Sequence, residues 1–247
     1  MTSDHFFIPK KAIAGDSVDI TGPENRHLAL VLRVRPGDEV RLFDEDGARY
    51  RGRIEAVARD RTRLTLIEKH AAPDGPRVRV ALGQALLKNK AMDFVVQKAV
   101  ELGAVEIVPL AAERSVVRSD DGWERKAARW ARIAREAAKQ SRRAAVPAIG
   151  RPVMVGGLAG RSEPPDGRFV LTEKGGPPLK AFLLAPPQGR TPDAVLVAVG
   201  PEGGWSPAEE ASFAGQGFRA ASLGAGVLRA ETAALSALTL IDQLWNS

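Results

Sequence analysis

The first 70 residues alternate apolar and polar positions over short stretches, a period of two that is typical of β-strands with one buried face. We expect strands at residues 39–43, 50–57 and 64–67. Turn-forming residues separate them at 44–47 and 59–62, and this close spacing of turns favours a small β-barrel or sandwich. Residues 71–76, AAPDGP, are predicted to be a linker because they stop regular structure.

After Pro76, apolar runs alternate with segments whose apolar residues recur every three to four positions, which is the helical period. The expected strands cover residues 78–82, 105–110, 168–172, 194–199 and 220–223. The expected helices cover residues 88–102, 123–143, 207–214 and 230–245, and residues 156–167 are expected to form a loop. Alternating strands and helices predict an α/β fold, with a parallel sheet covered by helices on both faces.

Charge is distributed unevenly along the 247 residues, which carry a formal net charge of +6. Residues 75–155 hold 16 Lys and Arg against 8 Asp and Glu, whereas residues 1–74 hold 13 of each. Residues 156–247 hold 7 against 9. A basic excess confined to one segment favours a polyanionic partner, because Lys and Arg release counterions from phosphate. A solvated basic helix face is the alternative interpretation.

Several classes of protein are disfavoured by composition. The chain has no cysteine, so disulfides, thiolate nucleophiles and cysteine-ligated metals are excluded. The histidines His5, His27 and His70 are scattered, and we expect no metal site. No apolar run approaches the roughly 18 residues of a membrane span, and the N-terminus has no signal pattern. A cytoplasmic protein is expected.

Three of the expected strands in the second half end in glycine-bearing loops: LTEKGG at 171–176, GPEGG at 200–204 and LGAGVLRAET at 223–232. Ligands of open parallel sheets bind at the carboxyl ends of strands, and glycine lets the main chain approach them closely. The phosphate-binding P-loop, the dinucleotide fingerprint and the GxSxG nucleophile motif are all absent. The loops therefore suit a neutral or cationic small molecule, although turns and close packing would also explain the glycines.

The pair of motifs at 200–204 and 223–233 resembles the C-terminal signature of the RsmE family. These are small-subunit ribosomal RNA methyltransferases of the SPOUT (trefoil-knot) superfamily. Further matches, in order along nearly the whole chain, include LGQ at 82–84, QKAVELG at 97–103 and PGD at 36–38. Two positions depart from the family pattern: Lys139 stands where glutamate is usual, and Arg142 where glycine is usual. Both departures concern RNA contacts rather than the cofactor loops.

The resemblance implies an N-terminal PUA-like β-barrel at 1–72 that binds RNA, and a C-terminal α/β trefoil-knot methyltransferase domain at 77–247 with a mostly parallel sheet. It implies a homodimer that uses S-adenosylmethionine to methylate N3 of one uridine in the 16S rRNA of the small ribosomal subunit. The cofactor-binding residues that it implies are Leu171, Thr172, Glu173, Val199, Gly200, Gly203, Gly204, Leu223, Gly224, Val227, Leu228, Arg229 and Thr232.

Uridine N3 carries a proton and is not nucleophilic until that proton leaves, so a base or a cation that stabilises the anion is needed. The expected catalytic residues are Arg229, which would steady the uridine anion, and Glu202 or Glu231, which would accept the proton or orient Arg229. Structural roles are the alternative: Glu231 would stabilise the start of the terminal helix, and Glu202 would pair with Arg229.

The Watson–Crick edge that carries N3 is hidden in a duplex, so the target must be unpaired or flipped out. The expected RNA-binding residues are Arg26, Arg33, Arg35, Lys88, Lys98, Arg114, Arg118, Gln140, Arg142 and Arg143, with Lys90, Arg125, Arg129 and Arg132 adding positive charge. Two other functions stay open: a knot methyltransferase acting on transfer RNA, for example on ribose 2′-OH, and a non-catalytic RNA-binding assembly factor.

Overall fold

The computed structural model describes residues 5–71, 75–88, 90–115, 122–141, 143, 145–160, 166–186 and 189–247. Contacts divide the chain into two compact units. The first comprises the residues up to Gly75 together with Ala138–Val146, and the second comprises Pro76–Ala137 and Pro147–Ser247. The expectation that 1–72 and 77–247 act as separate domains stays a prediction.

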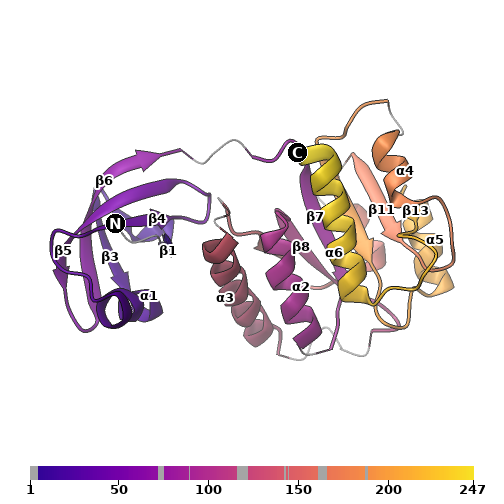
Figure 1. Cartoon of the computed structure of the whole chain (residues 1–247). Helices are drawn as coiled ribbons and strands as arrows, with labels where there is room; N and C mark the ends of the chain where they lie inside the picture. Colours follow the sequence, from indigo (N-terminus) through magenta and orange to yellow (C-terminus); the bar gives the residue numbers. More distant parts are fainter. Residues whose placement is uncertain are drawn as a thin grey trace. The chain divides into compact units, whose positions relative to one another are not determined.

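The first unit is built on one six-stranded sheet (Figure 1). Its strands are β1 His5–Phe7, β2 Ile13–Ala14, β3 Ser17–Thr21, β4 Glu39–Phe43, β5 Arg49–Val57 and β6 Arg61–His70. Their order is β1-β4-β5-β6-β3-β2, and every pairing is antiparallel except that of β1 with β4. Alternate residues such as Phe6, Leu42 and Leu64 form its buried core, as the period of two predicts.

A helical segment interrupts the strands of the first unit, and the expectation of strands alone is wrong here. The 3₁₀ turn η1 covers Lys10–Ala12, and helix α1, Gly22–Arg26, runs into the π-helical turn η2, His27–Leu32. Pro at the start of α1 is favourable because its fixed φ suits the first helical turn. Arg33 ends the segment in the left-handed conformation, with φ of 52°.

A buried carboxylate organises the turn between β4 and β5. Asp44 is fully buried and accepts hydrogen bonds from the amides of Asp46 and Ala48, each at 3.0 Å, and from the Tyr50 hydroxyl at 2.8 Å. Burial, together with the hydrogen bond to Asp44, raises the pKa of Tyr50 to about 12. The carboxylate thus satisfies groups that would otherwise be orphaned in the core.

The second unit carries a seven-stranded sheet in which every pairing is parallel. Its strands are β7 Arg79–Ala85, β8 Glu106–Ala111, β9 Ala148–Ile149, β10 Val153–Met154, β11 Gly167–Leu171, β12 Ala194–Val199 and β13 Arg219–Ala221. The order is β10-β8-β7-β12-β11-β13, and β9 pairs with β8 beside this path. The expected parallel sheet is confirmed.

Helices pack on both faces of this sheet. They are α2 Lys90–Glu101, α3 Trp123–Ser141, α4 Leu179–Leu184, α5 Pro207–Gly215 and α6 Ala230–Ile241, with the 3₁₀ segment η3 Val155–Gly160 and the π-helical turn η4 Asp242–Asn246. Leu196 and Ala198 of β12 face a core cluster with Phe213 of α5 and Leu158 of η3. The alternate residues of β12 face the opposite side, where α6 contacts β7, β12 and α2 (Figure 1).

Four short elements of the second unit were not expected from the sequence. Residues 156–167 were expected to be a loop, but η3 covers 155–160 and β11 begins at Gly167. The other three are α4 and the two-residue strands β9 and β10. None of these has enough residues to show a period of its own.

The end of the chain returns from the edge of the sheet to its middle. After the edge strand β13, the chain runs through residues 222–229 into α6, which packs over the central strands β7 and β12. Asn246 then makes two hydrogen bonds to Val78, just before β7. Its Oδ1 accepts from the Val78 amide at 2.8 Å, and its Nδ2 donates to the Val78 carbonyl at 3.2 Å. This is the return path that the expected trefoil knot requires.

Candidate functional site

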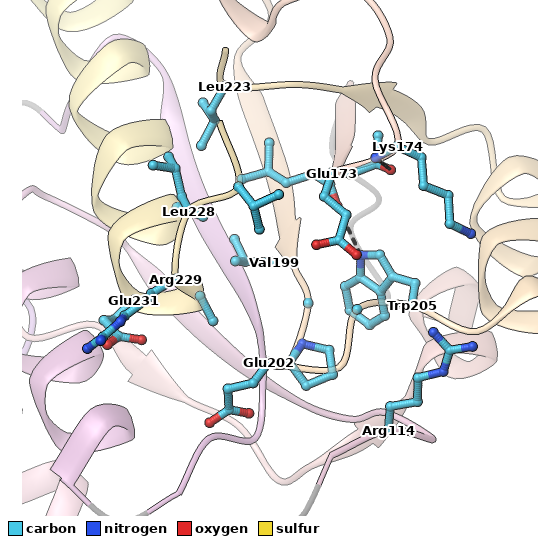
Figure 2. Close-up of a pocket in the computed structure, with 18 of the residues that line it drawn as sticks. Arg114, Glu173, Lys174, Val199, Glu202, Trp205, Leu223, Leu228, Arg229 and Glu231 are labelled. Atoms are coloured by element: carbon cyan, nitrogen blue, oxygen red, sulfur yellow. Dashed lines mark hydrogen bonds between the residues drawn. The ribbon is translucent and has the colours of Figure 1, made fainter. Parts of the chain in front are cut away.

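A cavity of about 560 Å³ lies at the carboxyl ends of β11, β12 and β13 (Figure 2). The three glycine-bearing loops that follow these strands line it, together with the first turn of α6. β11 pairs with both β12 and β13, so parallel pairing brings loops from distant parts of the sequence to one edge. This is where ligands bind in open parallel sheets.

The loop after β12 forms one wall through tight main-chain packing. Gly200 lies against the indole of Trp205, where a Cβ atom would come within 3.2 Å of the ring. Gly204 adopts φ of 68°, in the left-handed region. Its amide donates to the Pro201 carbonyl oxygen at 2.9 Å, which closes the turn. The Trp205 indole nitrogen donates to the Leu171 carbonyl at 3.1 Å, so the wall is tied to the end of β11.

The loop after β11 contributes charged groups. The Glu173 carboxylate points into the space between the loops, close to Gly204 (Figure 2). The Lys174 amide donates to the Thr172 hydroxyl at 3.1 Å, and the Lys174 ammonium pairs with Glu210 of α5 at 2.6 Å. Glu173 therefore presents a negative charge that a cationic ligand would match.

The loop after β13 exposes apolar side chains. Val227 is 74% exposed and Leu228 40%, high values for apolar residues, and both line the cavity. Arg229 is the N-cap of α6 and makes no side-chain cap hydrogen bond. The loop thus offers apolar side chains and the amides of a helix start to the same space.

A buried glutamate joins two neighbouring loops. Glu209 of α5 is 9% exposed, and its carboxylate accepts from the Ser206 amide at 2.9 Å and from the Glu113 amide at 2.8 Å. The Ser206 hydroxyl in turn accepts from the Glu209 amide, completing a capping box. Next to Glu113, Arg114 lines the cavity and donates to the Gly203 carbonyl at 3.1 Å. The loop after β8 is thereby fixed to the loop after β12.

Most of the residues expected from the sequence come together around this cavity. Those that line it are Arg114, Leu171, Thr172, Glu173, Val199, Gly200, Glu202, Gly204, Leu223, Val227, Leu228, Arg229 and Glu231. Gly203 and Gly224 belong to the same loops and Thr232 to the first turn of α6, but none of the three is among the lining residues. Sequence reasoning missed Ala91, Lys174, Pro201, Trp205, Glu210, Gly226, Ala230 and Ala233. A large aromatic residue directly after a glycine loop was the signal for Trp205.

The three expected catalytic residues lie along one edge of the cavity (Figure 2). Within the part of the chain that the structure describes, no ion pair within 4.0 Å joins Arg229 to Glu202 or Glu231. Glu231 lies in the first turn of α6, where the negative charge of a carboxylate interacts favourably with the positive end of the helix dipole. The geometry leaves Arg229 and Glu202 exposed and able to meet a ligand.

The expected RNA-binding residues are dispersed over both units. Arg118 and Arg142 lie outside the described residues. Exposed positions are Arg26, Arg33, Arg35, Lys88, Lys90, Arg125, Arg132 and Gln140. Arg143 is half-buried, Lys98 pairs with Glu101 at 2.8 Å, and Arg129 pairs with Asp93. Lys139 pairs with Glu24 at 2.8 Å and lies over the ring of Phe6.

The described residues contain no cluster of three or more metal-ligating side chains among His, Cys, Asp and Glu. None of their helices combines the length and the apolar character needed to cross a membrane.

Comparison with known proteins matches both units. Residues 74–242 match the family described as RNA methyltransferase domain, and residues 20–67 match the RNA methyltransferase PUA domain. The ribosomal RNA small subunit methyltransferase E of Bacillus subtilis is 32% identical over 90% of this chain and 88% of its own length. That of Synechocystis is also 32% identical, over 94% of this chain and 74% of its own.

Solved structures show the same fold over the whole chain. Methyltransferase E of Neisseria gonorrhoeae, bound to S-adenosylmethionine, superposes with a TM-score of 0.84 at 30% identity and covers 98% of both chains. A putative methyltransferase of Legionella pneumophila, also in complex with S-adenosylmethionine, gives 0.86 at 27% identity with the same coverage. From its sequence, its two matched domains and its fold, the chain belongs to the RsmE family of RNA methyltransferases.

Proposed function

We propose that this protein uses S-adenosylmethionine to methylate N3 of a uridine in the 16S rRNA of the small ribosomal subunit. The observation that carries the proposal is the cavity walled by three main-chain loops at the carboxyl ends of β11, β12 and β13. In a member of the RsmE family, this cavity is the natural place for the methyl donor.

The residues present fit S-adenosylmethionine. The cavity, about 560 Å³, lies within the usual range for small-molecule sites. Gly200 and Gly204 leave space that a Cβ atom would take from Trp205 and Glu173. Glu173 and Glu202 bring negative charge to a donor that carries a sulfonium. When bound, S-adenosylmethionine would supply an electrophilic methyl group, and the three loops would hold and orient the cofactor.

The cofactor set that we propose keeps the residues expected from the sequence. Gly203 and Gly224 act in it by shaping their loops and Thr232 by its place in the first turn of α6, because other residues of these segments line the cavity. Trp205 joins the set, since its indole supports Gly200 and ties the loop to Leu171.

Arg229 is proposed to stabilise the uridine anion. It is exposed at the rim of the cavity and has no ion pair to Glu202 or Glu231 within the described chain, so its guanidinium is available to the carbonyl oxygens of uracil. Glu202, exposed on the same edge, is the proposed proton acceptor. Glu231, half-buried in the first turn of α6, suits a positioning role.

The basic residues expected to bind RNA complete the proposal. The first unit would hold the substrate RNA, as the match of residues 20–67 to the RNA methyltransferase PUA domain supports. A homodimer in the cytoplasm is the proposed working form.

Mass spectrometry of rRNA nucleosides tests the activity, using a strain that lacks the gene, with and without the gene restored. N3-methyluridine should vanish from 16S rRNA and return on complementation. A different missing nucleoside, such as a ribose-methylated one in transfer RNA, would overturn the proposed substrate. Absence of S-adenosylmethionine binding by calorimetry would instead indicate a non-catalytic RNA-binding protein.

Single-turnover methylation tests the role of Arg229. The Arg229→Ala variant at saturating cofactor should lose at least about tenfold in rate, since electrostatic stabilisation of a developing anion is worth several kcal/mol. Arg229→Lys keeps the charge and serves as the matched variant. Full activity of Arg229→Ala would show that Arg229 does not act on the anion.

A further inference from the structure

The cavity at the carboxyl ends of β11, β12 and β13 carries more charged side chains than the proposed chemistry uses. Among the described residues that line it, four carboxylates are set against three cations: Glu173, Glu202, Glu210 and Glu231 against Arg114, Lys174 and Arg229. The lining thus holds one negative charge in excess. Glu202, Glu231 and Arg229 lie along the edge proposed for uridine, and Glu173 lies away from that edge (Figure 2).

Two of the lining cations are engaged by groups other than Glu173. The Lys174 ammonium pairs with Glu210 at 2.6 Å, and the Arg114 guanidinium donates to the Gly203 carbonyl at 3.1 Å. Within the part of the chain that the structure describes, no ion pair within 4.0 Å joins Glu173 to a cation. Its negative charge is therefore available to a ligand.

Hydrogen bonds hold the loop that carries Glu173. The Thr172 amide donates to the Ala221 carbonyl at 3.0 Å, and the Ser222 hydroxyl donates to the Gly176 carbonyl at 3.0 Å. These bonds tie the loop after β11 to the end of β13, one on each side of Glu173 in the sequence. Because the loop is already held, little conformational entropy is lost when its carboxylate meets a ligand.

Gly204 leaves room for the Glu173 carboxylate. A Cβ atom at Gly204 would lie 3.2 Å from Glu173 Oε1, tighter than an ordinary van der Waals contact. The carboxylate thus lies against bare main chain of the loop after β12, in the space between the loops (Figure 2). Apolar residues such as Val199 and Leu228 line the same cavity and limit the screening of this charge by water.

The proposed reaction changes the charge of the cofactor. As the methyl group passes to uridine N3, which loses its proton, the electron pair of the broken S–C bond stays on sulfur. The cationic sulfonium of the donor is thereby replaced by the neutral thioether of S-adenosylhomocysteine. A side chain that senses this one difference distinguishes the donor from the by-product.

We infer that the Glu173 carboxylate makes the cavity prefer the cationic donor to S-adenosylhomocysteine, so that the by-product leaves more readily than the donor. The inference rests on the proposed function, because that function supplies both cofactor forms. Glu173 is in this sense a specificity-determining residue, and it takes no part in the transfer of the proton from N3.

Calorimetric titration of the full chain tests this role with three ligands that share their adenosine and amino-acid ends. S-adenosylmethionine carries a sulfonium and sinefungin carries a protonated amine at the same place, whereas S-adenosylhomocysteine is neutral there. Glu173→Gln removes the charge of the side chain, and Glu173→Asp keeps it. The matched control is Glu113→Gln, which makes the same change on the loop after β8, at an exposed side chain that is not among the lining residues.

Glu173→Gln should lose about tenfold in affinity for the two cationic ligands, because the energy of an exposed charge pair lies between the values for bulk water and for a protein surface. Its affinity for S-adenosylhomocysteine should stay close to that of the wild type. Glu173→Asp should keep the preference for the cationic ligands, and Glu113→Gln should bind all three as the wild type does. In multiple-turnover methylation of small-subunit rRNA, Glu173→Gln should be half-inhibited at about a tenfold lower ratio of S-adenosylhomocysteine to S-adenosylmethionine.

Equal losses for all three ligands would overturn the inference, because they would place the carboxylate on a group that the ligands share, such as the ribose diol or the α-ammonium. A loss for the cationic ligands no greater than that of Glu113→Gln would overturn it as well. If the preference depends on Glu173 but no rRNA uridine is methylated at N3, the proposed substrate fails while the role of Glu173 stands.

Discussion

The bridge made by Glu209 offers a sharp test of how the cavity at the carboxyl ends of β11, β12 and β13 is held together. Its two carboxylate oxygens each accept one main-chain amide, from Ser206 at 2.9 Å and from Glu113 at 2.8 Å. Substitution by glutamine keeps the shape but leaves a single acceptor oxygen. The new amide group would then face a main-chain N–H, donor against donor.

The cost follows from the burial of this group. Glu209 is 9% exposed, so water cannot replace the lost acceptor. Losing one hydrogen bond to a charged group and leaving its donor unsatisfied costs about 2–3 kcal/mol. With a urea m-value of about 2.5 kcal/mol/M, the midpoint of unfolding should fall by about 1 M. Affinity for S-adenosylmethionine should also fall several-fold, because the tethered loops carry Arg114 and Gly204 at the cavity.

The neighbouring residue provides the control. Glu210→Gln makes the same chemical change one position along α5, where the side chain is 35% exposed and pairs with Lys174. Partly exposed pairs contribute about 1 kcal/mol at most, so its unfolding free energy should stay close to that of the wild type. Urea unfolding of the two variants side by side measures the difference. Equal stability of Glu209→Gln and Glu210→Gln would refute the bridge.

Three further perturbations have defined outcomes. Gly204→Ala places a Cβ at φ of 68° and should lower the free energy of unfolding in urea by about 1–2 kcal/mol. Gly215→Ala, in a helix with open space around the glycine, should cause no such loss. Equal losses in the two variants would contradict backbone strain at Gly204. The pKa of Tyr50 is raised from 10.0 to about 12. The stability that its protonated hydroxyl contributes to the folded state is therefore fully present below pH 10 and is lost as the pH rises towards 12. The stability advantage of the wild type over Tyr50→Phe should therefore shrink by about 2–3 kcal/mol across that window, and a constant difference would be evidence against the shift. Lys139→Glu should destabilise by roughly 3 kcal/mol or more by opposing Glu24, and the double reversal with Glu24→Lys should recover most of the loss; no recovery would show that the pair is not the cause.

The apolar and polar pattern predicted those strands and helices that are long enough to show at least one full repeat of the strand or helix period. The expected bounds of 39–43 and 194–199 agree with β4 and β12. Gly103 ends α2 at φ of 81°, as a left-handed glycine after a helix should. The segment at 22–32 was missed because its two helical turns are too short for a period, although Pro23 after Thr21 was a usable start signal.

The arrangement of the site was less accessible to sequence reasoning. The glycine loops indicated a main-chain cavity, but which strands are neighbours depends on long-range pairing that no local pattern encodes. An ion pair of Arg229 with Glu202 was a natural expectation from complementary charges, yet none is present in the described chain. The approach of Glu173 to Gly204 was equally hidden, since those residues meet only through the pairing of β11 with β12.

A donor cavity built from main chain has an evolutionary consequence. Most side chains in its loops can be exchanged without altering the main chain that walls the cavity, provided that the glycines and the anchors such as Trp205 and Glu209 persist. Solved structures that are 30% and 27% identical to this chain hold S-adenosylmethionine, which fits a cofactor kept while most of the surface changes. Selection on this protein should fall on backbone shape at the donor and on side-chain chemistry only at Glu173 and where RNA is touched.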